Sequence, residues 1–260
     1  HISIAMAKPR LYQQVLRADP PMERDLRMAK EIQAHLLPAR LPDLGHLKIA
    51  ARTVSARQLG GDLYDFIPYT GQRTAIAVGD VSGKGTGAAL YGAVVSGILR
   101  TQALRHPAPA ELLTAVNQAL LERQVESQFM TLIFALWSEK TRQLAVANSG
   151  LPYPIHVTAH GCAIIPAAGI PLGMLPESAY EEQGVKLPPG EMVVFVSDGI
   201  TEFMNPRGEE YGRQRLENLL RRHYGEPPET VLGAIFADSE RFGEGLPAAD
   251  DRTVVVLQSV

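Results

Sequence analysis

Several features that identify common classes of protein are scarce in this 260-residue sequence. Its only cysteine, Cys162, excludes an internal disulfide, and no cluster of cysteine and histidine has the spacing of a zinc site. There are 25 basic and 28 acidic residues, so the net charge of −3 offers no basic excess for binding nucleic acid. The longest apolar runs have the length of strands and fall short of the roughly 20 residues that cross a bilayer. We therefore expect a protein of the reducing cytoplasm that neither binds nucleic acid nor spans a membrane.

The amino-terminal part of the chain differs from the rest. Residues 22–37 place Met22, Leu26, Ala29, Ile32 and Leu36 at steps of three and four, which predicts a helix with one apolar stripe that ends before Pro38. A shorter apolar series predicts an earlier helical piece, separated from this helix by two prolines. We expect residues 1–40 to form a helical linker or regulatory segment and residues 41–260 to form one domain. The stripe either docks on that domain or forms the seam of a parallel homodimer.

The remaining sequence alternates between groups of strands and pairs of helices. Apolar runs and alternation predict strands at 47–56, 62–69, 73–81, 129–139, 143–150, 154–159, 162–167, 180–190, 191–199 and 251–260. Helical periodicity predicts helices at 85–105, 108–124, 212–223 and 227–242. Because strands and helices do not alternate one by one, we expect an α+β fold in which helices cover antiparallel sheets.

The glycine-rich stretch at residues 78–87, VGDVSGKGTG, does not fit a nucleotide-binding loop. A P-loop needs a serine or threonine directly after its lysine, whereas Gly85 follows Lys84 here. The glycines at 79, 83, 85 and 87 also lack the spacing of a dinucleotide-binding loop. The distinctive feature of the stretch is Asp80, which lies at the end of an apolar run.

Aspartates stand at the ends of several predicted strands. They are Asp62, Asp80, Asp198 and the adjacent pair Asp250 and Asp251, and a glycine neighbours each of the first three. Any one of them alone is typical of a turn. Carboxylates gathered at one edge of a sheet repel each other unless a cation lies between them, and Mg²⁺ and Mn²⁺ prefer oxygen ligands. Together the aspartates predict a site for a hard divalent cation.

An ordered set of motifs resembles a known family. The motifs are GGDLYD, GDVSGKGTGAAL, NSGLPYPI, GIPLGMLPES, LPPGEMVVFVSDGITEFMNPRGEEYG and DDRTVVVL. This set, from about residue 23 to the end, resembles the metal-dependent Ser/Thr protein phosphatases of the PPM (type 2C) group, and more narrowly the bacterial RsbU/SpoIIE branch. The resemblance implies a four-layer α-β-β-α sandwich with a binuclear Mn²⁺ or Mg²⁺ site at one end.

The same resemblance implies roles for individual residues. Asp80 would bridge the two ions and, with Asp62, Asp198 and Asp250, form the catalytic set. The implied metal ligands are Asp80, the backbone carbonyl of Val81, Asp198, Asp62 directly or through water, and Asp250 or else Asp251. The loop after Asp80 lacks the histidine that serves eukaryotic relatives as a general acid, so the residue with that role is unassigned. We do not assign the role to Lys84, because two cations would repel a protonated lysine beside them.

We therefore expect a cytoplasmic phosphoserine and phosphothreonine phosphatase. By resemblance, its substrate would be a phosphorylated STAS-type antagonist of an anti-sigma factor, and an upstream sensor would act through the amino-terminal helix. Two alternatives remain at this point. The same fold could serve as a non-catalytic interaction module, or the site could hydrolyse small phosphoesters.

Overall fold

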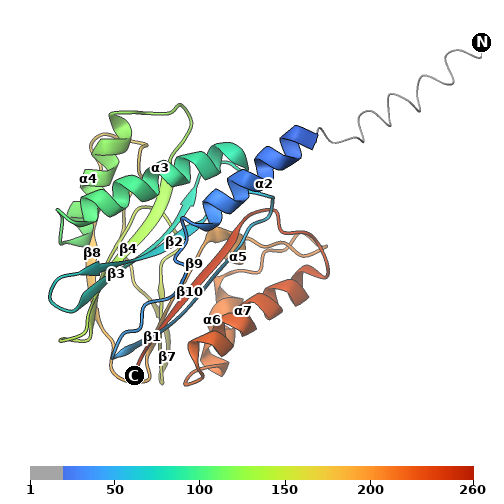
Figure 1. The fold of residues 1–260 in the computed structure, drawn as a ribbon. Coiled ribbons are helices and arrows are strands. Elements are labelled where there is room, and N and C mark those ends of the chain that lie inside the picture. Colours follow the sequence, from blue (N-terminus) through green and yellow to red (C-terminus); the bar gives the residue numbers. More distant parts are fainter. Residues whose placement is uncertain (1–19) are drawn as a thin grey trace, which may run out of the picture.

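Two antiparallel sheets of five strands each form the centre of the protein (Figure 1). The structure is a computed structural model that describes residues 20–260. One sheet has the order β1-β10-β9-β6-β7, with β1 at Leu47–Val54, β10 at Arg252–Ser259, β9 at Met192–Val196, β6 at Ile155–Thr158 and β7 at Gly161–Ile164. The other has the order β2-β3-β4-β5-β8, with β2 at Leu63–Tyr69, β3 at Arg73–Val81, β4 at Met130–Ser138, β5 at Gln143–Asn148 and β8 at Glu182–Lys186.

The two faces of each sheet pack in different layers, as the alternation along β2 shows. Tyr64 and Phe66 join the core between the sheets, where they share one cluster with Phe195 and Val255 of the opposite sheet. Leu63 and Ile67 point the other way and pack with helical residues. Successive side chains on a strand point to opposite faces, so both faces of β2 are buried.

Helices cover the outer face of each sheet and complete four layers (Figure 1). Helices α3, at Thr86–Ala103, and α4, at Pro109–Leu121, pack on the sheet that contains β3. Helices α6, at Arg213–Arg222, and α7, at Pro228–Gly243, pack on the sheet that contains β10. This is the predicted α+β architecture. None of the helices within residues 20–260 is long and apolar enough to cross a membrane.

One short helix was not expected from the sequence. The predicted strand at 191–199 ends early, as β9, and helix α5 occupies Asp198–Thr201. Gly199 lies so close to the backbone of Asp251 that a Cβ atom there would overlap the Asp251 carbonyl. The close approach of two chain segments therefore turns the chain at the point where the apolar pattern alone suggests that a strand continues.

Helix α2, at Pro20–Ala34, begins at the two prolines, which the first turn of a helix tolerates. It ends sooner than the predicted residue 37. Leu26 and Ala29 of the predicted stripe are half-buried, but Ile32 is 61% exposed, so the stripe is only partly docked. The side chain of Met22 and the earlier predicted helical piece lie outside the described residues.

The helical layer formed by α6 and α7 contains a buried carboxylate. Asp238 of α7 accepts hydrogen bonds from the Tyr211 hydroxyl at 2.9 Å, from Arg215 Nε at 2.9 Å and from Arg241 Nη1 at 3.1 Å. The hydrogen bond from Arg215 is the main reason that the pKa of Asp238 falls below its ordinary value of 3.8, although burial opposes the shift. Asp238 therefore stabilises the packing of α7 on α6 and on the loop before it.

We predict that Asp238→Asn lowers the free energy of unfolding by about 2 kcal/mol near pH 7, because charge-assisted hydrogen bonds are lost. A depressed native pKa stabilises the fold above the unfolded value of 3.8, and this stabilisation disappears as the pH falls through the native pKa. In urea titrations at pH 3, the difference in the free energy of unfolding between Asp238→Asn and the parent should therefore be smaller than near pH 7. Glu209→Gln, in an exposed pair with Arg207, is the control and should change little. An equal loss at both pH values would contradict the electrostatic explanation.

Candidate metal centre

The antiparallel register brings the predicted acids to one end of the sandwich. Asp80 is next to last in β3, and Asp62 comes directly before β2, whose Leu63 pairs with Gly79. In the other sheet, Asp198 follows β9 and Asp250 precedes β10, and these strands pair through Val196 and Val254. Four strand ends from two sheets therefore meet at this edge. Residues more than 180 positions apart in sequence become neighbours there.

Asp62 lies between the two sheets and is only 6% exposed. Its Oδ2 accepts hydrogen bonds from Ser197 Oγ, directly after β9, at 2.8 Å and from Thr253 Oγ1 of β10 at 2.6 Å. Its Oδ1 is buried and has no hydrogen-bond partner among the described residues. Sequence reasoning missed the two hydroxyl donors, although both stand within two residues of predicted acids. A proton held by Asp80 is shared with Asp62, and a cation at this place would take over that role between the two carboxyl groups.

Burial and mutual repulsion raise the pKa values of the acids. Burial, opposed by the hydrogen bonds from Thr253 and Ser197, raises the pKa of Asp62 to about 7. Burial, with the charges of Asp62 and Asp198, raises the pKa of Asp80 to about 9. The pKa of Asp198 is also raised, by burial and by the charge of Asp250. Without added positive charge, the cluster therefore keeps protons that isolated aspartates lose well below neutral pH.

The adjacent residues Asp250 and Asp251 have different environments. Asp251 Oδ1 accepts a hydrogen bond from the Ala56 backbone N–H at 2.7 Å, and Oδ2 accepts one from the Gly61 N–H at 2.6 Å. Asp250 is partly exposed, and its Oδ2 lies 2.7 Å from Lys84 Nζ. Asp251 thus holds the loop before β2, whereas Asp250 faces the acid cluster and currently pairs with an ammonium group.

The backbone around Val81 is shaped by a glycine. A Cβ atom on Gly61 would lie 2.9 Å from the Val81 carbonyl oxygen and 3.3 Å from Asp80 Oδ1. Such a contact is closer than carbon and oxygen normally allow, so a side chain here would displace the carbonyl or the carboxylate. The Gly61 position therefore keeps open the space next to two of the oxygen atoms expected to bind metal.

The acid cluster offers mainly oxygen atoms as possible metal donors. Within residues 20–260, no three acidic, histidine or cysteine side chains stand close enough to form a coordination shell as they are arranged here. The set nevertheless supplies what Mg²⁺ and Mn²⁺ prefer: several carboxylates, a nearby backbone carbonyl and one buried oxygen without a partner. Lys84 provides the positive charge on Asp250 in this arrangement. The donors fit a hard divalent cation, which would relieve the repulsion among them.

Asp65, only three residues after Asp62, lies on the other face of the sheet. Its Oδ1 accepts a hydrogen bond from Arg100 Nη2 of α3 at 2.7 Å. The side chain of Asp65 is buried, and burial raises its pKa against the effect of Arg100. Period-two alternation from Asp62 into β2 accounts for this separation, because residues three apart on a strand face opposite ways. Asp65 therefore anchors a helix and takes no part in the acid cluster.

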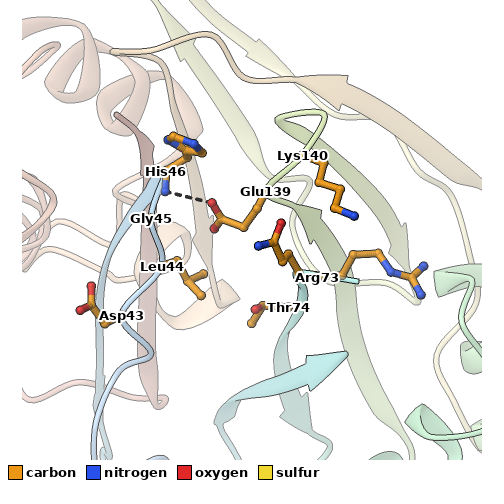
Figure 2. A pocket seen from close by; sticks show the side chains of 9 residues that line it. Asp43, Leu44, Gly45, His46, Arg73, Thr74, Glu139 and Lys140 are labelled. Atoms are coloured by element: carbon orange, nitrogen blue, oxygen red, sulfur yellow. Dashed lines mark hydrogen bonds between the residues drawn. The ribbon is translucent and has the colours of Figure 1, made fainter. Parts of the chain in front are cut away.

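Two cavities lie at opposite ends of the sandwich. One, of about 400 Å³, is lined by Asp198 and Glu202 together with the loops after β5 and β7. The other, of about 500 Å³, lies between the start of β1 and the turn from β4, where the Glu139 carboxylate accepts a hydrogen bond from the His46 backbone N–H (Figure 2). Arg73 in this second cavity begins β3, seven residues before Asp80, which is about 24 Å along a strand. Only the first cavity adjoins the acids.

Comparison with known proteins gives a consistent result. The family model described as Stage II sporulation protein E (SpoIIE) matches residues 70–259. The chain is 27% identical to protein IcfG of Synechocystis sp., covering 90% of this chain and 41% of IcfG. It is 26% identical to the phosphoserine phosphatase RsbU of Bacillus subtilis, covering 91% of this chain and 70% of RsbU. The chain thus spans less than half the length of one of these curated relatives.

Solved structures share the fold. The SiaA-PP2C domain of Pseudomonas aeruginosa superimposes with a TM-score of 0.81 at 22% identity, covering 92% of this chain and 96% of that domain. RsbX in complex with magnesium superimposes with a TM-score of 0.63 at 15% identity, covering 85% of this chain and 99% of RsbX. The four-layer α+β sandwich expected from the sequence is therefore confirmed as the fold of PP2C-type phosphatases.

We predict that Mn²⁺ binding near pH 7 releases between about one and two protons per chain, most of them from Asp80 and the rest from Asp62. An acid with a pKa of about 9 is protonated at this pH, and a cation favours its charged form. Calorimetric titrations in buffers of different ionisation enthalpy measure the released protons. Asp65→Asn, which alters a buried carboxyl outside the cluster, should leave the number unchanged. Binding without any proton release would show that the acids are already ionised.

Proposed function

Because the chain belongs to the SpoIIE family of PPM-type phosphatase domains, we propose that it hydrolyses phosphoserine and phosphothreonine in a protein substrate. The observation that carries the proposal is the convergence of Asp62, Asp80, Asp198 and Asp250 at one end of the sandwich, where burial and repulsion raise the pKa values of Asp62, Asp80 and Asp198. The relative RsbU is named as a phosphoserine phosphatase, which supports the same reaction here.

The finer parts of the proposal concern cofactor, substrate and location. We assign the cofactor as a pair of Mn²⁺ or Mg²⁺ ions, which the donor set suits and which the magnesium complex of RsbX supports. We assign the substrate as a phosphorylated STAS-type antagonist of an anti-sigma factor, on the strength of the similarity to RsbU. We place the reaction in the cytoplasm, because the single cysteine requires no oxidising compartment.

Some residues of the site would hold the metal ions, and Asp62 would have an orienting role. Asp80 would bridge the ions, the Val81 carbonyl would bind one of them, and Asp198 and Asp250 would complete the other side. A pair of cations in such a site binds the phosphoryl group, activates water and stabilises charge on the departing oxygen. Asp62 is fixed by the hydroxyls of Ser197 and Thr253 through one carboxylate oxygen and interacts with Asp80, so it would orient the bridging residue.

The direct test measures phosphate release from phosphorylated STAS proteins with Mn²⁺ and with excess chelator. We expect release only with the metal, while circular dichroism shows a folded chain in both conditions, because the sandwich core is large and independent of the acids. Equal turnover of small phosphoesters would favour the alternative of a small-molecule hydrolase. Binding of the STAS protein without any release of phosphate would favour an interaction module.

We predict that Asp80→Asn lowers kcat by at least about a thousandfold, on the order of 4 kcal/mol of transition-state stabilisation, because it removes the bridging carboxylate. Asp65→Asn should lower kcat much less, although it weakens the anchor to Arg100. Single-turnover assays well below the unfolding temperature of each variant compare the two. Similar losses in kcat would mean that the catalytic cluster is assigned to the wrong face of the sheet.

Helix α2 contacts the loop that carries the acids, so we propose that upstream sensors or partners act through it. The Gln33 side chain donates to the Gly60 carbonyl and accepts from the Gly60 N–H, so the amide pairs with the backbone in both directions. Gly60 precedes Gly61 and Asp62, and Leu26 lines a cavity with Leu59 and Thr86. A movement of the helix therefore changes the position of the loop next to the acids.

We predict that Leu26→Asp and Gln33→Ala each change basal activity or oligomeric state, although neither residue takes part in the chemistry. A charge at position 26 disfavours docking, and loss of the Gln33 amide frees Gly60. Phosphatase assays and sedimentation velocity give the two readouts. Arg24→Ala, on the exposed side of the same helix, is the control. If mass, metal affinity and rate all stay unchanged in both variants, the helix is a passive tether.

A further inference from the structure

The cavity of about 400 Å³ beside Asp198 extends beyond the acid cluster, and most of the residues that line it are not acidic. Its walls come from the loop after β5, which includes Leu151 and Tyr153, and from the segment after β7, which includes Ala167. Among the described residues that line it, two are acidic, Asp198 and Glu202, and none is basic. Because Asp198 borders both the cavity and the acid cluster, the cavity lies next to the place where a substrate phosphate would bind.

The walls of this cavity are held by hydrogen bonds. The Asn148 side chain donates to the Leu151 carbonyl at 2.9 Å and accepts from the N–H groups of Gly150 and Leu151, each at 3.0 Å. On the other side, a Cβ atom at Gly169 would overlap the Asn148 carbonyl, so the two loops are in close contact. The cavity is therefore preformed, which lowers the entropic cost of binding a side chain.

The charge in the cavity is unbalanced. Glu202 is exposed, and its carboxylate makes no hydrogen bond or ion pair with any residue in the described part of the chain. The charges of Asp198, Glu210 and Asp250, all acidic, act on Glu202 and add to burial in raising its pKa. A cation bound at the cluster would offset Asp198 and Asp250, but Glu202 would keep its charge towards the cavity. The cavity thus favours a positive group and disfavours an acidic one.

We infer that this cavity selects substrates with a lysine or arginine within about three residues of the phosphoserine, with Glu202 as the residue that determines the preference. The inference rests on the proposed phosphatase function. Leu151, Pro152 and Tyr153 offer an apolar wall for the methylene stem of such a side chain, while its charged end meets Glu202. The Tyr153 side chain is 38% exposed, so its ring is accessible to a guanidinium group.

The test uses peptides in which an arginine, a glutamine or a glutamate is moved through three positions on each side of one phosphoserine. Binding is measured by fluorescence anisotropy in Mn²⁺ with a hydrolysis-resistant phosphonate in place of the phosphate, and kcat/KM is measured with the phosphoserine versions. At one or more positions, we expect arginine to bind about fivefold tighter than glutamine, as one partly exposed ion pair allows, and glutamate to bind more weakly than both.

Two variants identify the source of the preference. In Glu202→Gln, the ratio of arginine to glutamine affinities should fall to about one. In Glu229→Gln, an exposed acid on α7 outside the cavity, the ratio should stay as in the parent. A parent enzyme without an arginine preference, or a preference that survives Glu202→Gln, would overturn the inference. An arginine preference in binding without turnover of any peptide would support the cavity but refute the proposed phosphatase.

Discussion

Repulsion among carboxylates that are wholly or partly buried is the interaction on which this end of the molecule depends. Burial is the largest reason that the pKa of Asp80 is raised, and the charges of Asp62, Asp198 and Asp250 raise it further. Such an arrangement is unfavourable by itself, and only a rigid framework keeps the groups together. The framework here is the pairing of strands: β3 with β2, and β10 with β9, each bring two acids to the same edge. The core between the sheets provides the stability that offsets the repulsion.

Polar side chains next to the acid cluster form hydrogen bonds with the backbone of the loops that carry the acids. Asp251 binds two backbone N–H groups of the loop before β2, which would otherwise be left without partners beside the acids. Ser197 also accepts a hydrogen bond from the Thr253 N–H at 2.9 Å, while its hydroxyl donates to Asp62. These polar side chains therefore satisfy backbone N–H groups of the loops, and Ser197 also orients the Asp62 carboxylate. A site with several acids needs this support, since each loop by itself is a short, glycine-containing turn.

Much of the fold followed from the sequence because its signals are local. The predicted strands at 73–81 and 62–69 correspond to β3 and, within one residue, to β2, and the acids at strand ends were visible as residues. The family motifs added the four-layer arrangement, which the comparisons confirm. The roles of individual acids as metal ligands, and the boundary at residue 40, remain predictions.

Other features depend on distant parts of the chain and left no local pattern. The hydroxyls of Ser197 and Thr253 reach Asp62 only because two sheets face each other. Asp250 and Asp251 are the same residue type side by side, so only the geometry of the turn separates their environments. The Gln33 amide is one polar residue on a charged helix, and its pairing with Gly60 depends on where the helix docks.

The position of β10 in its sheet also bears on how the chain acquires this structure during synthesis. This strand lies between β1 and β9, yet it is made after every other strand in the described chain. Until residues 252–259 leave the ribosome, the edges of β1 and β9 that face each other lack their partner, and Asp62 lacks the Thr253 hydroxyl. A nascent chain therefore exposes two unpaired strand edges and an incomplete acid cluster at the same time. Completion of this sheet and completion of the acid cluster therefore both require the last strand.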